Sequence, residues 1–247
     1  MAELPIRVET RGAAVHVLFD RPEKANAIDA EMWQAIPDIV AHAQATPGAR
    51  CLVISSVSDG IFSAGADVSD FDSTDVLEWG LAHHRMVTAA SASIADSGLV
   101  SIARVTGPCA GGAVALAVAC DFRFAADSAV FVLPPARLGL IYPQADTTRL
   151  VKLIGPSATK RLLFTAAHMD ARWALKTGLV DEVHRLDDLD AAVDQIVAQV
   201  EVNNATSIRA MKQTVAAAAF SATEEDPEVW QIRSEEHTSE LQSRSVI

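Results

Sequence analysis

Short runs of Val, Ile, Leu and Phe recur along the chain, and polar or turn-forming residues bound each run. Bounded runs that are rich in β-branched residues favour strands. The pattern therefore predicts a sheet. Its expected strands are Val15–Phe19, Cys51–Ile54, Leu99–Val105, Phe122–Phe124, Val130–Val132 and Val180–Val183.

Between these runs, the apolar residues recur at helical spacing. The expected helices are Asp29–Gln44, Thr74–Ala95, Ala113–Val118 and Thr147–Leu153. Asp29 is expected to cap the first helix and Pro37 to kink it. Because strands alternate with helices, the chain is expected to have an α/β fold. After Gly178 the strand signal fades, and Leu189–Val200, Ser207–Ala219 and Thr223–Ile232 predict a helical C-terminal region from about residue 190.

Length and composition favour one compact domain with a small appendage. Half of the 247 residues are hydrophobic, which is enough for a large core, and only 5% are aromatic, so small and β-branched side chains should fill it. The longest apolar run, Ala113–Cys120, is far shorter than the roughly 20 residues that span a bilayer. Met1–Thr10 carries charges where a signal peptide needs an apolar stretch. We therefore expect a cytoplasmic protein.

Charge and cysteine content exclude several classes of partner. The net charge of −12 makes nucleic acids and membrane surfaces poor partners. A polyphosphate ligand would have to be held by a few local cations and by backbone N–H groups. The three cysteines have no metal-site spacing, so we expect reduced, buried thiols and no metal site.

Two segments of small residues carry the candidate chemistry. Phe62–Val68 would let a ligand approach main-chain N–H groups, although an ordinary tight turn explains it equally well. Arg104–Ala113 runs from a strand through Gly111 and Gly112 into a helix, whose first N–H groups and positive dipole end form an anion site. The glycine spacing does not match the dinucleotide-binding fingerprint.

Together with Arg21–Ala27, these two segments resemble the ordered motifs of the crotonase (enoyl-CoA hydratase/isomerase) superfamily, and the resemblance extends from about residue 5 to residue 230. It implies a spiral of ββα units followed by a helical C-terminal region. It also implies that the N–H groups of Ala66 and Gly112 form an oxyanion hole for an acyl-CoA thioester. The residues that would line the coenzyme A groove are Lys24, Ala25, Ala64, Gly65, Asp67 and Val68. Lys24 and Arg21 are candidate cations for the phosphates or, alternatively, solvated surface residues.

The resemblance also sets expectations about cofactors and assembly. Coenzyme A would enter as part of the substrate, with no permanently bound cofactor. Relatives form trimers, often paired into hexamers, and continue past Arg233. We therefore expect a spiral core over residues 1–189, a truncated helical region over residues 190–232, and a homotrimer or hexamer if the native C-terminus were present.

The chain ends in a compositionally distinct tail. From Arg233 to Ile247 the apolar periodicity disappears, and the sequence resembles the translation of a sequencing-adapter read. We expect this tail to be non-native. The alternative is a short polar tail.

The chain departs from the superfamily pattern at its acidic positions. The two positions that hold the hydratases' glutamates are Ala115 and Pro135, and a position that is aspartate in some isomerases is Pro143. None of these can act as acid or base, so ordinary hydration is not expected unless Asp67 or Asp146 replaces them.

Two other groups are candidates for the missing chemistry. Tyr142, the only tyrosine, resembles the tyrosine that methylmalonyl-CoA decarboxylases of the superfamily place beside the substrate carboxylate; alternatively it is a packing residue. His83, His84 and Arg85 lie on a helix that flanks the acyl pocket in relatives, where one of them could supply a proton or grip a carboxylate; alternatively they form a solvated face.

The sequence thus predicts an acyl-CoA enzyme with enolate chemistry of the isomerase, decarboxylase or lyase type. The alternative is a non-catalytic relative that binds acyl-CoA.

Overall fold

A computed structural model describes residues 4–67, 69 and 76–219. The candidate groove residue Val68, the predicted helix Thr223–Ile232 and the tail Arg233–Ile247 lie outside this part of the chain.

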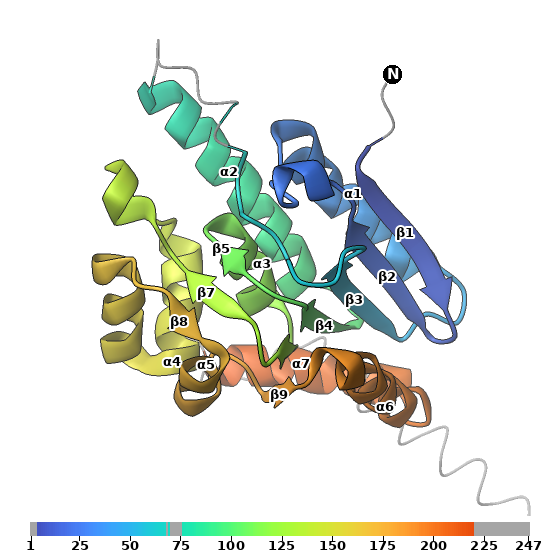
Figure 1. The fold of residues 1–247 in the computed structure, drawn as a ribbon. Helices are drawn as coiled ribbons and strands as arrows, with labels where there is room; N and C mark the ends of the chain where they lie inside the picture. The colour runs from blue at the N-terminus through green and yellow to red at the C-terminus, as the bar shows by residue number, and fades with distance from the viewer. Residues whose placement is uncertain (1–3, 68, 70–75, 220–247) are drawn as a thin grey trace, which may run out of the picture.

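A six-stranded sheet forms the centre of the molecule (Figure 1). Its strand order is β1-β2-β3-β4-β6-β9, with β1 antiparallel to β2 and every other pair parallel. The bounds are Ile6–Arg11 (β1), Ala14–Phe19 (β2), Cys51–Ser56 (β3), Val100–Val105 (β4), Phe122–Ala126 (β6) and Glu182–His184 (β9). Four of the expected strands are confirmed here as β2, β3, β4 and β6, whereas the expected strand Val180–Val183 overlaps β9 only at residues 182 and 183. The edge strand β1 is an addition, because it is mostly exposed and lacks an apolar run.

A smaller sheet lies beside the first and carries one half of the candidate site. It has the order β5-β7-β8, with bounds Cys109–Ala110 (β5), Val130–Val132 (β7) and Met169–Asp170 (β8). β5 leads through Gly111 directly into α3, so this sheet fixes where that helix begins.

Most of the expected helices are confirmed. The bounds are Ala30–Ala45 (α1), Val76–Ala95 (α2), Gly112–Ala119 (α3), Gln144–Thr165 (α4), Ala171–Thr177 (α5), Leu189–Glu201 (α6) and Ala205–Ala219 (α7), with short 3-10 turns at Pro22–Lys24 (η1), Pro135–Leu138 (η3) and Leu186–Asp188 (η4). Asp29 caps α1 by accepting a hydrogen bond from Met32 N at 2.9 Å, and α1 continues through Pro37. α4 is longer than expected and breaks at Gly155, which has non-helical angles of φ 75° and ψ 165°.

Helices cover both faces of the large sheet, and this gives the core two parts (Figure 1). α1, α2 and α3 pack with the larger part, whereas Leu189, Val193 and Val197 of α6 pack on the opposite face. α3 is buried along Ala113–Ala119, which confirms the expected small-residue packing at this position. Large aromatic side chains, including Phe19, Trp33 and Phe62, are also fully buried.

The three cysteines are free and buried, as expected. Burial raises the pKa of the Cys51 and Cys120 thiols to about 12. Within residues 4–67, 69 and 76–219, the structure contains no helix that combines the length and apolarity needed to cross a membrane. The domain boundary near residue 189 stays a prediction.

Candidate active site

The two small-residue segments meet backbone to backbone. The N–H groups of Phe62 and Ser63 donate to the carbonyl oxygen of Pro108 at 3.1 and 3.2 Å, and Ala110 N donates to Ser63 O at 2.9 Å. The loop that follows β3 is therefore fixed against β5 and the start of α3.

Gly65 allows this close approach. It has a φ of +88°, and a Cβ atom added there would lie 2.5 Å from the carbonyl oxygen of Ala110 and 3.2 Å from the nitrogen of Gly112. No L side chain fits that geometry without displacing backbone atoms. The loop therefore reaches the N-terminus of α3 only because position 65 is glycine.

Two main-chain donors at this junction lack acceptors. Gly65 N donates to Ser63 Oγ, Asp67 N to Ile28 O, and Gly111 N to Val132 O. By contrast, neither Ala66 N nor Gly112 N has a hydrogen-bond acceptor in the part of the chain that the structure describes. Gly112 is the first residue of α3, so the helix dipole adds positive potential there. The junction is suited to an oxygen that carries negative charge.

The Arg21–Ala27 segment forms a third side of this junction. Ala25 and Asn26 both adopt left-handed backbone angles, with φ of 51° and 52°. The buried Asn26 side chain accepts from Arg21 N at 2.9 Å and donates to Phe62 O at 3.3 Å. Ala64 N donates to Ala25 O at 2.9 Å. The last bond places Ala25 next to Ala64, and Lys24, one residue earlier, is exposed.

Arg21 and Asp67 form a partly buried ion pair. Arg21 Nη1 lies 2.6 Å from Asp67 Oδ2 and also donates to the carbonyl oxygen of Ala27. Hydrogen bonds from Ser69, and then the bond from Arg21, lower the pKa of Asp67 to about 2. Asp67 is therefore a permanent anion that binds a cation, which makes it a poor proton acceptor. Arg21 is correspondingly less available to phosphates than Lys24.

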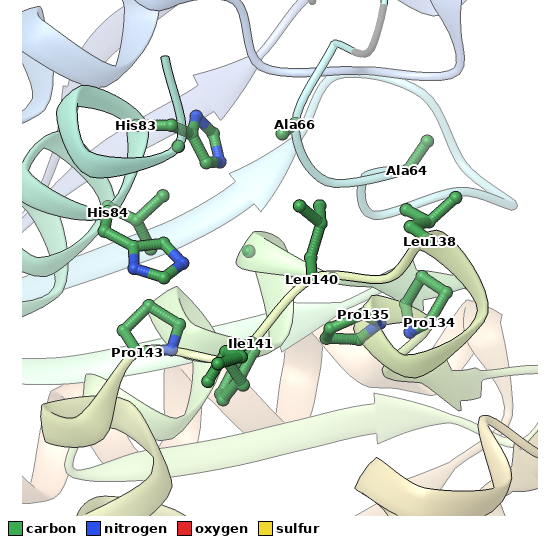
Figure 2. A pocket seen from close by; sticks show the side chains of 15 residues that line it. Ala64, Ala66, His83, His84, Pro134, Pro135, Leu138, Leu140, Ile141 and Pro143 are labelled. Carbon is green, nitrogen blue, oxygen red and sulfur yellow. The ribbon is translucent and has the colours of Figure 1, made fainter. Parts of the chain in front are cut away.

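A cavity of about 140 Å³ opens beside Ala66 and Gly112 (Figure 2). Its walls come from the loop after β3, from α2, from the start of α3 and from the segment between β7 and α4. The lining residues are Ala64, Ala66, Gly80, His83, His84, Val87, Gly111, Gly112, Pro134, Pro135, Leu138, Leu140, Ile141, Tyr142 and Pro143.

The lining contains no carboxylate side chain from the described residues. Pro135 and Pro143, which the sequence resemblance matched to acidic positions, line the cavity. Ala115 is 1% exposed and does not line the cavity. The side chains around the cavity that can exchange a proton are His83, His84 and Tyr142.

His83 and His84 both reach the cavity from α2 (Figure 2). These two residues are half-buried, whereas Arg85 is exposed. The His83 ring packs edge-on against Trp33, with centroids 6.1 Å apart and planes at 88°. Trp33 in turn packs directly against Gly112. A Cβ atom added to Gly112 would lie only 2.8 Å from the Trp33 ring. The sequence marks Trp33 only as an apolar helix position, so its contact with the site could not be predicted.

Tyr142 lines the cavity with its ring, but its hydroxyl group is buried and has no hydrogen-bond partner among the described residues. Burial, and then the charge of Asp146, raise its pKa well above the usual value. Asp146 is 1% exposed and accepts from Ser91 Oγ and Arg149 Nη1, each at 2.8 Å. Burial raises the pKa of Asp146, which does not line the cavity. The contact with Arg149 is a local helix pair, whereas no pattern in the sequence predicts the contact with Ser91, 55 positions away.

Comparisons with known proteins agree with the fold and with the motifs. The family profile described as enoyl-CoA hydratase/isomerase matches residues 9–246. The chain is 30% identical to the crotonyl-CoA hydratase of Syntrophomonas wolfei, over 86% of this chain and 81% of that protein. It is 31% identical to the carnitinyl-CoA dehydratase of Citrobacter koseri, over 87% of this chain and 81% of that protein. A solved structure of an enoyl-CoA hydratase/isomerase family protein from Hyphomonas neptunium superposes with a TM-score of 0.89 at 33% identity, over 95% of this chain and 90% of that one.

Proposed function

Because the chain belongs to the enoyl-CoA hydratase/isomerase family, we propose that it binds an acyl-CoA thioester and stabilises the enolate formed from it. The observation that carries this proposal is the pair of amides at Ala66 and Gly112. Both lack acceptors among the described residues, and both residues line one largely apolar cavity.

The thioester oxygen is the group that these amides would hold. Removing a proton or a carboxylate from the carbon next to a thioester moves an electron pair onto that oxygen. Two fixed N–H donors stabilise the charge as it develops, and losing one such donor costs on the order of a hundredfold or more in rate. The N-terminus of α3 reinforces Gly112 in this role.

The coenzyme A moiety would lie along Lys24, Ala25, Ala64, Gly65 and Asp67. Lys24 supports this placement because it is exposed and adjacent to the loop. Asp67 would act indirectly, by fixing the loop through Arg21. A single exposed lysine is a modest phosphate site, which is consistent with a chain of net charge −12.

The acyl group would be short. A cavity of about 140 Å³ is comparable to one that encloses a single benzene ring. Its walls are mostly Pro, Leu, Ile and Val side chains, so the enclosed part of the ligand would be largely apolar.

The reaction would be of the isomerase, decarboxylase or lyase type rather than ordinary hydration. Ala115 and Pro135 provide no acid or base, Asp67 is bound to Arg21, and Asp146 lies outside the cavity. Decarboxylation needs no base to begin, because the bond to the departing carbon dioxide leaves its electrons on the substrate. The buried hydroxyl of Tyr142 does not favour a direct contact with a substrate carboxylate.

A second candidate is a protein that binds acyl-CoA without turning it over. The absence of carboxylates from the described lining of the cavity favours it. Assembly into trimers or hexamers and a cytoplasmic location stay predictions.

A panel of enoyl-, β-keto- and malonyl-type CoA esters tests both candidates. Binding is measured by calorimetry and turnover by mass spectrometry, with free coenzyme A as the reference. We expect at least one short ester to bind, and Lys24→Gln to weaken binding more than Lys176→Gln, which removes an exposed lysine from α5. Turnover supports the enzyme, binding alone supports the second candidate, and the absence of any binding refutes both.

A further inference from the structure

We infer that the imidazole of His83 carries the substrate proton during enolate formation and collapse. This inference rests on the proposed function and names the acid–base residue that the superfamily's acidic positions do not supply in this chain. His83 would be a catalytic residue, because its ring would contact the reacting carbon.

The first argument is position. Trp33 contacts two parts of the site. Its ring packs against Gly112, and it meets the His83 ring in a T-shaped arrangement with centroids 6.1 Å apart. His83 is therefore one aromatic ring away from the α3 N-terminus. It lines the cavity together with Ala66 and Gly112. Figure 2 shows its ring on the Ala66 side of the cavity.

The carbon that reacts must lie on that side. A thioester oxygen held by Ala66 and Gly112 places the carbonyl carbon about 3 Å or slightly more from the amides, and the α-carbon is bonded to it. An acid–base group has to lie within hydrogen-bonding reach of that carbon's proton. A side chain that lines the cavity beside Ala66 is better placed for this than one at the far wall.

The second argument is that the other titratable side chains described near the cavity are poorly placed to carry the proton. In Figure 2 the His84 ring lies beside Pro143, whereas the His83 ring lies beside Ala66. The Tyr142 hydroxyl is buried away from the cavity surface. Asp67 and Asp146 are held in ion pairs and do not line the cavity. His83 is the remaining proton carrier on the side of the amides.

The chemistry balances with His83 alone. Neutral imidazole takes the α-proton, the electron pair of the C–H bond becomes the enolate double bond, and the carbonyl pair moves to the oxygen held by the two amides. The imidazolium then returns the proton to the α-carbon or to the γ-carbon of an unsaturated chain. In a decarboxylation, protonated His83 would instead donate its proton to the α-carbon after carbon dioxide leaves.

Exchange of the α-protons in D2O isolates this step from binding. But-3-enoyl-CoA is a suitable probe, since its four-carbon acyl group is short and its α-protons are allylic. Exchange and double-bond migration are followed by NMR, and binding is measured by calorimetry on the same samples. The variants are His83→Gln, His83→Ala with and without added imidazole, His84→Gln, and His42→Gln as a control on the exposed face of α1.

We expect His83→Gln to bind the ester with a nearly unchanged Kd but to lose exchange by about 10²- to 10⁴-fold. Added imidazole should restore part of the exchange in His83→Ala, which a purely structural role of His83 would not produce. His42→Gln should behave as the unsubstituted protein.

The inference is wrong if His83→Gln exchanges at the original rate, if His84→Gln is the variant that loses exchange, or if the unsubstituted protein binds the ester without exchanging it. In each of these outcomes the ester still binds, so the binding proposal survives. Absence of binding by the unsubstituted protein overturns the proposed function itself.

Discussion

Replacing Gly65 by Ala tests the central contact of the site. The new Cβ atom meets the carbonyl oxygen of Ala110 at 2.5 Å and the nitrogen of Gly112 at 3.2 Å, and both are backbone atoms that cannot rotate away. The loop must therefore move away from α3. This displacement separates the Ala66 and Gly112 amides, which should no longer act on one oxygen.

The expected loss of stability has two parts. Holding alanine at a φ of +88° costs about 1–2 kcal/mol, and overpacking a rigid contact costs about 1–3 kcal/mol more. Gly48→Ala is a matched control, because Gly48 has a φ of +79° but no atom within 4 Å of the added Cβ. Gly48→Ala should therefore show only the cost of the left-handed backbone conformation, without the cost of overpacking.

Urea unfolding measures both free energies, and proton exchange on but-3-enoyl-CoA measures the effect on the site. Gly65→Ala should be less stable than Gly48→Ala and should lose about a hundredfold or more in exchange rate. Equal destabilisation by the two variants would show that the contact with Ala110 is not tight. Unchanged exchange in Gly65→Ala would refute the role of the two amides.

Three further predictions concern charge, packing and thiols. Asp67→Asn should lower the free energy of unfolding at pH 7 by on the order of 1–2 kcal/mol, because the folded pKa of Asp67 is depressed. Measured by denaturation across pH, the difference should persist above the ordinary pKa of 3.8 and disappear as the pH falls through about 2; a constant difference would contradict the pairing. Gly112→Ala should destabilise by about 1–3 kcal/mol through overlap with Trp33, and combining it with Trp33→Leu should be less than additive in urea unfolding. A thiol reagent should label no cysteine in the native protein and all three after unfolding, since all are buried; fast native labelling would contradict this burial. These are Cys51, Cys109 and Cys120.

The sequence was sufficient for elements whose signal is local. Apolar runs located the central strands, and Asp29 marked the start of α1. β1 was missed because an exposed edge strand has few buried positions to reveal it. The length of α4 was missed because Gly155 interrupts a helix that resumes at once. Local sequence patterns therefore predicted these elements poorly, at an exposed edge strand and at the break in α4.

The candidate site also has features that the sequence predicts and features that it does not. The two small-residue segments could be recognised because their composition is unusual, and the structure brings them together at Gly65 and Gly112. The pairing of Arg21 with Asp67 joins residues 46 positions apart, which no local pattern reports. For His83 the sequence favoured a solvated helix face over the cavity, because the helical spacing of α2 does not say which face another segment covers.

Because Trp33 contacts both Gly112 and His83, the position of α1 affects both groups of the proposed site. One indole ring touches both the residue that presents an amide and the residue that presents an imidazole, so a small rotation or shift of α1 alters the two together. Met32 and Ile36 are buried on the same helix as Trp33 and do not line the cavity. Substitutions that change the size of these buried side chains should therefore alter the reactivity of the site without changing any residue that lines the cavity.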